Sequence, residues 1–328
     1  MLGRSTLQLT ADAGRLPVTD NARVRVLVTG ANGYLGGAVA ELLRSRGHDV
    51  VGLVHRELSQ VPAGLPVRSA DLLDTDALMA AVQDREVVCH LAGLTRVRES
   101  FADPLRFFDV NVGGTVSLLR AMAEAQVRSL VFASTASIYG TPERQPMSED
   151  LPDNPPHPYA ASKHAAESVI TAQAATGHLG AVILRLFNIA GGADPDPTRI
   201  VPRILAVAAG DSPRLVINGD GTVVRDYVHV DDAATAFAAA MTQLPDPGAC
   251  RRYNIGSESG TSVVELVAAA ARMTGRRIPV EHRPAAPEPP QLVSDSGRAH
   301  RELQWKATTS EIDTILRDGW AARADSAG

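Results

Sequence analysis

Residues 26–37 read VLVTGANGYLGG: a short apolar run, then glycines at positions 30, 33 and 36, then a helical pattern that begins at once. Glycine has no Cβ, so the backbone of such a turn can approach a pyrophosphate closely, and the helix that follows offers free N–H groups to the anion. The same glycines could instead serve only the packing of a strand-to-helix turn. Because the turn lies inside a strand–turn–helix unit near the start of the chain, we expect dinucleotide binding here.

The sequence on either side of this turn alternates between strand and helix signals. Short apolar runs without polar alternation are typical of strands buried on both faces of a parallel sheet. The stretches between them carry apolar residues at helical spacing. We therefore predict an α/β fold built on a Rossmann-type, doubly wound parallel sheet. The predicted strands are residues 24–29, 50–54, 87–92, 130–134 and 181–186, and the predicted helices between them include residues 35–46 and 76–82.

The second half of the chain is richer in proline and glycine and predicts a smaller C-terminal α/β lobe that binds substrate. Helices are expected at residues 231–241, 262–273 and 310–321, the last with Ser310 as its N-cap. The predicted organisation is an N-terminal extension at 1–22, a dinucleotide-binding domain at 23–186 and the smaller lobe at 187–328. Segments near 215–255 are expected to return to the first domain.

Bulk composition excludes several classes of protein. A net charge of −5 gives no electrostatic footprint for nucleic acid or an anionic membrane. No apolar run reaches the roughly 18 residues of a membrane span, and the first residues lack a signal-peptide core. Cys89 and Cys250 lie far apart, outside any metal-binding spacing, so neither a disulfide framework nor a zinc site is expected. A cytoplasmic protein is the resulting expectation.

The residues after the second predicted strand bear on which dinucleotide binds. A carboxylate there would accept hydrogen bonds from the adenosine ribose and select NAD, but this strand is followed by His55 and Arg56. Arg56 could pair with the 2′-phosphate of NADP or could be a solvated loop charge. Asp71, which lies in SADLLD between the strands predicted at 50–54 and 87–92, is placed to accept a hydrogen bond from the adenine amino group, or else caps a helix. The sequence leaves NAD and NADP both open.

The segment YAASK places Tyr159 and Lys163 four residues apart, on one face of a predicted helix. A nearby ammonium and an oxidised nicotinamide would both lower the pKa of a phenol, which could then exchange a proton with an alcohol while hydride moves. Thr135 ends a predicted strand upstream, where its hydroxyl would point into the ligand crevice. The plainer interpretations are an incidental surface pair and strand-end turn chemistry.

Taken together, these segments resemble the extended short-chain dehydrogenase/reductase family, in particular its UDP-glucose 4-epimerase branch. The resemblance covers residues 24–320 and includes a series of motifs in the family's order. They are TGANGYLG, NVGGT at 111–115, ASTASIYG, YAASK, RLFNIAGG at 185–192, VRDYVHVDD at 224–232 and YNIGS at 253–257.

The resemblance implies roles for particular residues. Thr135 would take the place of the family's catalytic hydroxyl, Tyr159 would be the acid/base and Lys163 its partner. Asn188 and Arg225 would bind the nucleotide diphosphate with Thr135 beside the sugar; Arg225 paired with Asp226 at the surface is the alternative. The cofactor set would be Gly30, Asn32, Gly33, Tyr34, Leu35, Gly36, His55, Arg56, Asp71, Leu72, Leu91, Ala92, Gly93, Asn111, Ser134, Tyr159 and Lys163. A homodimer through the helices near 104–125 and 159–173 is also implied.

Three features of the sequence depart from the family pattern. Asn218 stands where the family often has an aromatic residue, before the glycine of the base-binding loop. The carboxylate after the second strand is absent. The family's Arg-x-Gly-Asp segment stands here as AAPE at 285–288, so one phosphate-binding arginine is lost or moved to Arg283.

The residues around Thr135 limit the reactions that the site is expected to catalyse. Ala136 and Ser137 follow it without a carboxylate, which argues against 4,6-dehydration. We therefore expect a nucleotide-sugar epimerase that works through a 4-keto intermediate, with an NADPH-dependent 4-ketoreductase as the alternative. A non-catalytic dinucleotide-binding regulatory protein is the alternative from another class. The cluster of His229, Asp231 and Asp232 is interpreted as a helix cap rather than a metal site.

Overall fold

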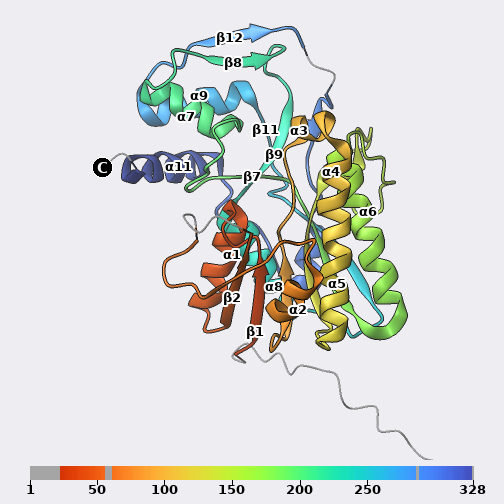
Figure 1. Cartoon of the computed structure of the whole chain (residues 1–328). Coiled ribbons are helices and arrows are strands. Elements are labelled where there is room, and N and C mark those ends of the chain that lie inside the picture. The colour runs from red at the N-terminus through yellow and green to blue at the C-terminus, as the bar shows by residue number, and fades with distance from the viewer. Residues whose placement is uncertain (1–22, 56–60, 286–287, 327–328) are drawn as a thin grey trace, which may run out of the picture.

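A parallel sheet forms the larger part of the molecule (Figure 1). The computed structural model describes residues 23–55, 61–285 and 288–326, and within these ranges seven strands join the sheet. In spatial order the strands are β10 (Cys250–Ile255), β6 (Gly180–Leu186), β5 (Ser129–Thr135), β4 (Val87–His90), β1 (Arg25–Thr29), β2 (Asp49–Val54) and β3 (Val67–Ser69).

The chain changes direction at the centre of this sheet. It runs from β1 outward through β2 to β3, then crosses back to place β4 on the other side of β1. At such a switch point the connections after the two central strands lead to opposite sides, and a crevice opens at the carboxyl ends of the strands. The glycine turn leaves β1 directly at this crevice.

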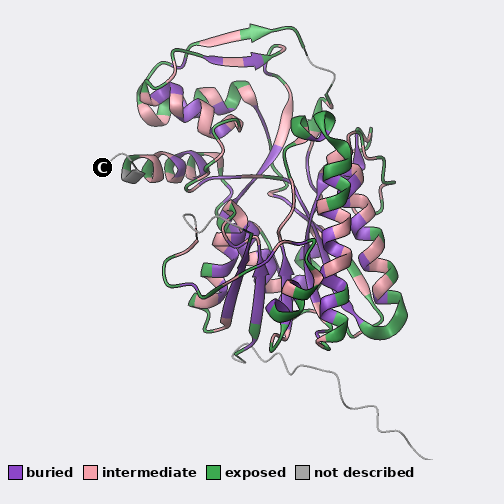
Figure 2. Cartoon of the chain, in the orientation of Figure 1, coloured by how far each residue is buried: buried purple, intermediate pink, exposed green. Residues whose placement is uncertain are grey.

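Helices cover both faces of the sheet, as the all-apolar strands require (Figure 2). Side chains alternate along β1: Val26 and Val28 pack on one face and Leu27 on the other, and all three are fully buried. Burial of each such side chain contributes about 1.5–3 kcal/mol. The first face carries α1 (Tyr34–Ser45) and α8 (Val230–Thr242), and the second carries α2 (Thr75–Val82), α5 (Gly114–Glu124) and α6 (Pro158–Gln173).

The smaller region lies beyond the carboxyl edge of the sheet (Figure 1). Strand β9 is its centre and pairs with β7, β11 and β13, while β8 pairs separately with β12. A second core forms where three helices pack around Leu205, Leu266 and Leu316. The strands are β7 (Asn188–Ala190), β8 (Leu215–Asn218), β9 (Val224–His229), β11 (Gly260–Ser262), β12 (Val280–Arg283) and β13 (Gln291–Leu292), and the helices are α7 (Ile200–Ala209), α9 (Val263–Thr274) and α11 (Ile312–Ser326).

Short helical segments complete the described chain. They are α3 (Val97–Ala102), α4 (Pro104–Phe108), a π-helical turn (Asp109–Gly113), a 3-10 turn (Ala136–Tyr139), a second π-helical turn (Ala174–His178) and α10 (Gly297–Leu303). Within the described ranges, none of the helices combines the length and the apolar character of a membrane-spanning segment.

The predicted fold class is confirmed, and the predicted helices and strands are found within a few residues of their expected limits. Within 215–255, β10 joins the large sheet and α8 packs against one of its faces, whereas β8 pairs with β12. The predicted strand 87–92 ends at His90, because the next two N–H groups bond to the Thr29 hydroxyl instead of a strand. The predicted extension at 1–22 lies outside the described residues.

The prediction of Ser310 as the cap of the last helix is wrong. The first-turn N–H groups of Thr314 and Ile315 bond to the carbonyl oxygen of Glu311. The Ser310 hydroxyl instead donates to Asp232 at 2.6 Å and accepts from the His229 N–H at 2.8 Å. Ser310 therefore ties the smaller region to the start of α8.

Candidate active site

A cleft of about 1470 Å³ runs between the carboxyl edge of the large sheet and the smaller region. We call its two sides the sheet wall and the lobe wall. The sheet wall carries Thr135, Tyr159 and Lys163 and rests on the buried Thr29 and His90. The lobe wall carries Asn188, Arg199, Arg225 and Glu288. Every described residue predicted for cofactor or substrate lines this cleft except Asn111. Arg56 lies outside the described residues.

The glycine turn has the shape that the close approach of a phosphate requires. Gly30 has a φ of +70°, and a Cβ there would lie 2.9 Å from the backbone nitrogen of Ala92. A Cβ on Gly36 would lie 2.0 Å from the carbonyl oxygen of Gly30, so a side chain at either position would displace backbone. Helix α1 begins at Tyr34 without a side-chain cap, so its N-terminal dipole faces the cleft. These residues fit the diphosphate of a dinucleotide.

At the adenosine end of the predicted cofactor site, His55 Nε2 lies 3.2 Å from Asp71 Oδ2. Asp71 also accepts a hydrogen bond from the Leu73 N–H at 3.0 Å. The helix-cap alternative for Asp71 is wrong, since Asp74 caps α2 by accepting from the Ala77 N–H. A carboxylate thus reaches this end of the cleft from the connection after β3 rather than from the end of β2.

A chain of buried hydrogen bonds holds the ends of β1 and β4 in place beneath the sheet wall. Thr29 Oγ1 accepts from the N–H groups of Leu91 and Ala92, each at 3.0 Å, so its own proton goes to His90 Nδ1 at 2.8 Å. His90 Nε2 then donates to Thr115 at 3.1 Å. This pattern requires a neutral imidazole. Burial, and secondly the charge of Lys163, lower the pKa of His90 to about 3.

Asn111 does not line the cleft, unlike its predicted position. Its Oδ1 accepts from the Leu94 N–H at 2.8 Å, and its Nδ2 donates to the Leu94 carbonyl at 3.0 Å and to Ser162 Oγ at 2.9 Å. Two of these three hydrogen bonds hold Leu94 in the loop after β4, and the third ties Asn111 to α6. Asn111 therefore shapes the cleft by holding that loop in place.

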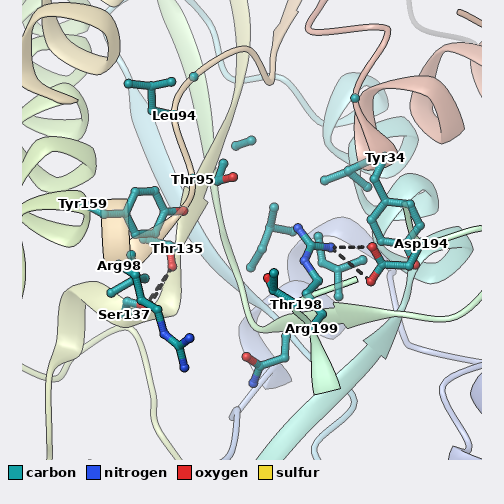
Figure 3. Close-up of a pocket in the computed structure, with 18 of the residues that line it drawn as sticks. Tyr34, Leu94, Thr95, Arg98, Thr135, Ser137, Tyr159, Asp194, Thr198 and Arg199 are labelled. Atoms are coloured by element: carbon teal, nitrogen blue, oxygen red, sulfur yellow. Dashed lines mark hydrogen bonds and ion pairs between the residues drawn. The ribbon is translucent and has the colours of Figure 1, made fainter. Parts of the chain in front are cut away.

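The Thr135, Tyr159 and Lys163 side chains converge from separate elements, as Figure 3 shows for the first two. Thr135 ends β5, and the other two lie on successive turns of α6, whose N-terminus is capped by the His157 ring at the Ala160 N–H. The pKa of Tyr159 is raised, because the effect of burial exceeds the opposing effects of the hydrogen bond with Thr135 and of the charge of Arg199. Thr135 Oγ1 also lies 3.1 Å from Ser137 Oγ and accepts a hydrogen bond from the Ser137 N–H at 3.2 Å.

The lobe wall places Asn188 and Arg225 in the cleft, but both are already engaged. Asn188 Nδ2 donates to the carbonyl oxygen of Asp226 at 3.1 Å. Arg225 Nη2 pairs with Glu288 at 2.8 Å, and its Nη1 donates to the carbonyl oxygen of Pro289 at 2.9 Å. The alternative of an Arg225–Asp226 ion pair is wrong, because the Asp226 carboxylate accepts from Ser257 and Ser294.

Sequence reasoning missed a cluster that faces Tyr159 across the cleft. Arg199 Nη1 lies 3.4 Å from Asp194, and its guanidinium stands 5.4 Å from the ring centroid of Tyr34 (Figure 3). The Tyr34 hydroxyl donates to the carbonyl oxygen of Gly191, which joins the glycine turn to the lobe wall. Arg98, Ser137 and Arg283 also line the cleft. No spacing in a proline-rich loop singles out Arg199 in advance.

The cap interpretation of His229 is confirmed. Its Nδ1 accepts from the Asp231 N–H at 3.1 Å at the start of α8. The Asp232 carboxylate accepts from Thr308, Thr309 and Ser310. Among the residues that the structure describes, no group of three His, Cys, Asp or Glu side chains could hold a metal ion.

Comparison with known proteins gives consistent matches over nearly the whole chain. The model of the NAD dependent epimerase/dehydratase family matches residues 26–256. A UDP-glucose 4-epimerase of Streptomyces lividans is 38% identical over 317 residues, which span 90% of this chain and 95% of the relative.

Solved structures of similar proteins match this chain over nearly its whole length. The UDP-glucose-4-epimerase of Stenotrophomonas maltophila with bound NAD and formylated UDP-arabinopyranose has a TM-score of 0.87 at 33% identity, covering 93% of this chain and 99% of that chain. MoeE5 in complex with UDP-glucuronic acid and NAD has a TM-score of 0.83 at 31% identity, covering 92% and 99%.

Proposed function

The chain belongs to the NAD dependent epimerase/dehydratase family, and from this premise we propose that it catalyses the 4-epimerisation of a UDP-hexose or a related sugar through a transient 4-keto intermediate. The resemblance inferred from the sequence motifs is confirmed, and so is the enzyme class, an NAD-dependent sugar-nucleotide epimerase. Of the two cofactors that the sequence left open, NAD is the one bound in the similar structures.

The observation that carries the proposal is the convergence of a phenol, a hydroxyl and a buried ammonium beside the glycine turn. Tyr159 would take the proton of the sugar C4 hydroxyl, and Thr135 would hydrogen-bond the same oxygen. The positive charge of Lys163 stabilises the phenolate that forms. NAD, when bound, supplies a reversible hydride acceptor. Tyr159 then returns the proton when the other face of the carbonyl is reduced.

The volume of the cleft supports a site that holds both molecules. Small-molecule pockets commonly enclose about 300–1,000 Å³, and this cleft is larger, at about 1470 Å³. On the lobe wall, Asn188 and Arg225 lie where we propose that the nucleotide diphosphate binds. Arg283, which the sequence offered as one of two alternatives for the missing phosphate-binding arginine, lines the cleft as well.

The alternatives are tested by the same assay. Purified protein given UDP-glucose should form UDP-galactose without added reductant, and UDP-glucuronic acid is the second substrate to try because MoeE5 holds it. A 4-ketoreductase would show net loss of NADPH with a keto sugar and no interconversion. A protein that binds dinucleotide without any turnover would be the regulatory class. Interconversion at catalytic rates rules out both.

A homodimer in a reducing, cytoplasmic setting is a further part of the proposal. Both cysteines are free in the structure. Phe101 and Leu105, at 64% and 74% exposure, lie beside the start of the helices from which the resemblance predicts dimer contacts. Sedimentation of the purified protein tests this, with a mass of two chains expected.

A further inference from the structure

A buried carboxylate outside the expected catalytic set lies directly behind the site. Glu167 stands one helical turn beyond Lys163 on α6, and its side chain is 2% exposed. It accepts hydrogen bonds from Arg185 Nε at 3.0 Å and from Arg185 Nη2 at 2.6 Å. It also accepts the hydroxyl proton of Ser134, the neighbour of Thr135. The hydrogen bonds from Arg185 and Ser134 therefore hold the Glu167 carboxylate in one position.

Burial removes most of the hydration of the Lys163 ammonium, and a cation–π contact with Phe132 offsets only part of that loss. Lys163 is 5% exposed, and its Nζ lies 4.3 Å from the centroid of the Phe132 ring. The neutral His90 ring faces it from β4, and Tyr159 lies one turn earlier on its own helix. Burial lowers the pKa of Lys163 to about 8, and the charge of Glu167 opposes that shift.

We propose that Glu167 is a positioning residue that keeps Lys163 charged: its carboxylate, fixed by Arg185 and Ser134, supplies the counter-charge of the ammonium from the next turn of α6. The consequence for turnover rests on the proposed function, in which Tyr159 needs the Lys163 cation. The effect on Lys163 itself does not depend on any substrate.

The charges around Glu167 allow this role. Arg185 makes a second bidentate pair with Asp153, at 2.7 and 3.0 Å, so Glu167 is not its sole counter-ion. Arg252 Nε lies 3.5 Å from Glu167, and His164 lies 3.4 Å from Asp153. Two carboxylates thus face two guanidiniums and an imidazole, and Glu167 acts on the Lys163 ammonium at longer range, without a direct ion pair between them.

The composition of the chain makes a direct test possible, because Lys163 and Lys306 are its only lysines. Protein labelled with 13C at the lysine Cε gives one signal for each, and the exposed Lys306 serves as the internal reference. We expect the Lys163 midpoint to lie near 8 in the unaltered protein. In Glu167→Gln it should fall by about one pH unit, since the variant removes the opposing charge.

Turnover supplies the second measurement. The alkaline limb of the kcat profile should move to lower pH in Glu167→Gln by the same amount as the Lys163 signal, and Glu167→Asp should restore it. Glu149→Gln is the matched control, because Glu149 is also a buried carboxylate, bonded to the Asn254 N–H and 3.6 Å from Arg298, and lies outside the Lys163 contacts. It should leave both the Lys163 signal and the alkaline limb unchanged.

A purely structural role for Glu167 predicts a different result. Glu167→Gln would then lose stability while the Lys163 midpoint stayed where it was, and that outcome overturns the proposal. If the single variant does not fold, Glu167→Gln with Arg185→Met removes the carboxylate without leaving its guanidinium partner behind, and the same shift is expected. A shifted Lys163 signal in a protein without epimerase activity would overturn the proposed function and leave the role of Glu167 standing.

Discussion

The two walls of the cleft differ in how far their polar interactions are buried. On the sheet wall, Thr29, His90 and Thr115 share buried hydrogen bonds, and Glu167 and Arg185 form a buried ion pair behind Lys163. On the lobe wall, the Arg225–Glu288 and Arg199–Asp194 ion pairs each have one partner that is 39% exposed, namely Glu288 and Arg199. Buried bonds hold one geometry, whereas half-exposed ion pairs are weak and exchange partners readily. The sheet wall is thus prepared for chemistry, and the lobe wall is suited to binding and release.

The largest expected effect tests the chemistry of the sheet wall. Tyr159→Phe removes the proton carrier and should lower kcat by about 10³-fold while nucleotide binding is kept. Tyr227→Phe is the matched control, because Tyr227 lines the same cleft from β9. Its kcat should stay within about tenfold of the unaltered protein, below the range of acid–base catalysis. Equal losses in the two variants would remove the distinction between the walls.

The second effect concerns the stability of the sheet wall in acid. The pKa of His90 is lowered from 6.5 to about 3 in the folded protein. Below pH 6.5, His90 is therefore protonated in the unfolded chain but stays neutral in the folded protein. The free energy of unfolding falls as the pH is lowered from 6.5 toward 3. Between pH 7 and pH 5 this one group should cost about 2 kcal/mol.

Urea unfolding at the two pH values measures this loss. His90→Gln keeps a donor and an acceptor but does not titrate, so its stability should fall by about 2 kcal/mol less over the same interval. An identical pH dependence in the variant and the unaltered protein would show that His90 takes up its proton in the folded state.

A smaller effect is expected on the lobe wall, with opposite signs for the two partners of one ion pair. Arg225→Gln should weaken UDP binding by about tenfold through loss of a charged hydrogen-bond donor. Glu288→Gln frees Arg225 and should strengthen binding slightly. Calorimetry at low and high salt measures both, and added salt should reduce the difference between the variants. If Glu288→Gln weakens binding as much as Arg225→Gln, the pair acts as one structural unit.

The smallest effect is expected at the adenosine end. His55→Asp puts a carboxylate at the end of β2, where it can accept from the ribose and repel a 2′-phosphate. The ratio of NAD to NADP affinity, measured on reconstituted protein, should rise by about fivefold. The gain is limited because Asp71 already brings a carboxylate there, 3.2 Å from His55. No change in the ratio would mean that the ribose does not reach this pair.

Sequence reasoning succeeded where local chemistry decides the structure. The glycine turn, the strand ends and the Tyr159–Lys163 spacing depend on backbone sterics and helical periodicity, which neighbouring residues set. It failed where partners come from distant segments. Asn111 holds Leu94, Arg225 pairs with Glu288, and Ser310 bonds to Asp232, 78 residues away. Those partnerships depend on how segments far apart in the chain pack in space, and no periodicity encodes them.

The return of hydride to the sugar from which it came is the central claim, and an isotope measures it directly. UDP-glucose deuterated at C4 is incubated with the purified protein, and the UDP-galactose formed is analysed by mass and by position of the label. We expect the deuterium to stay at C4 without added reductant, since Tyr159 exchanges only the hydroxyl proton. Product that has lost the deuterium to water, or to nucleotide released into solution, would contradict it.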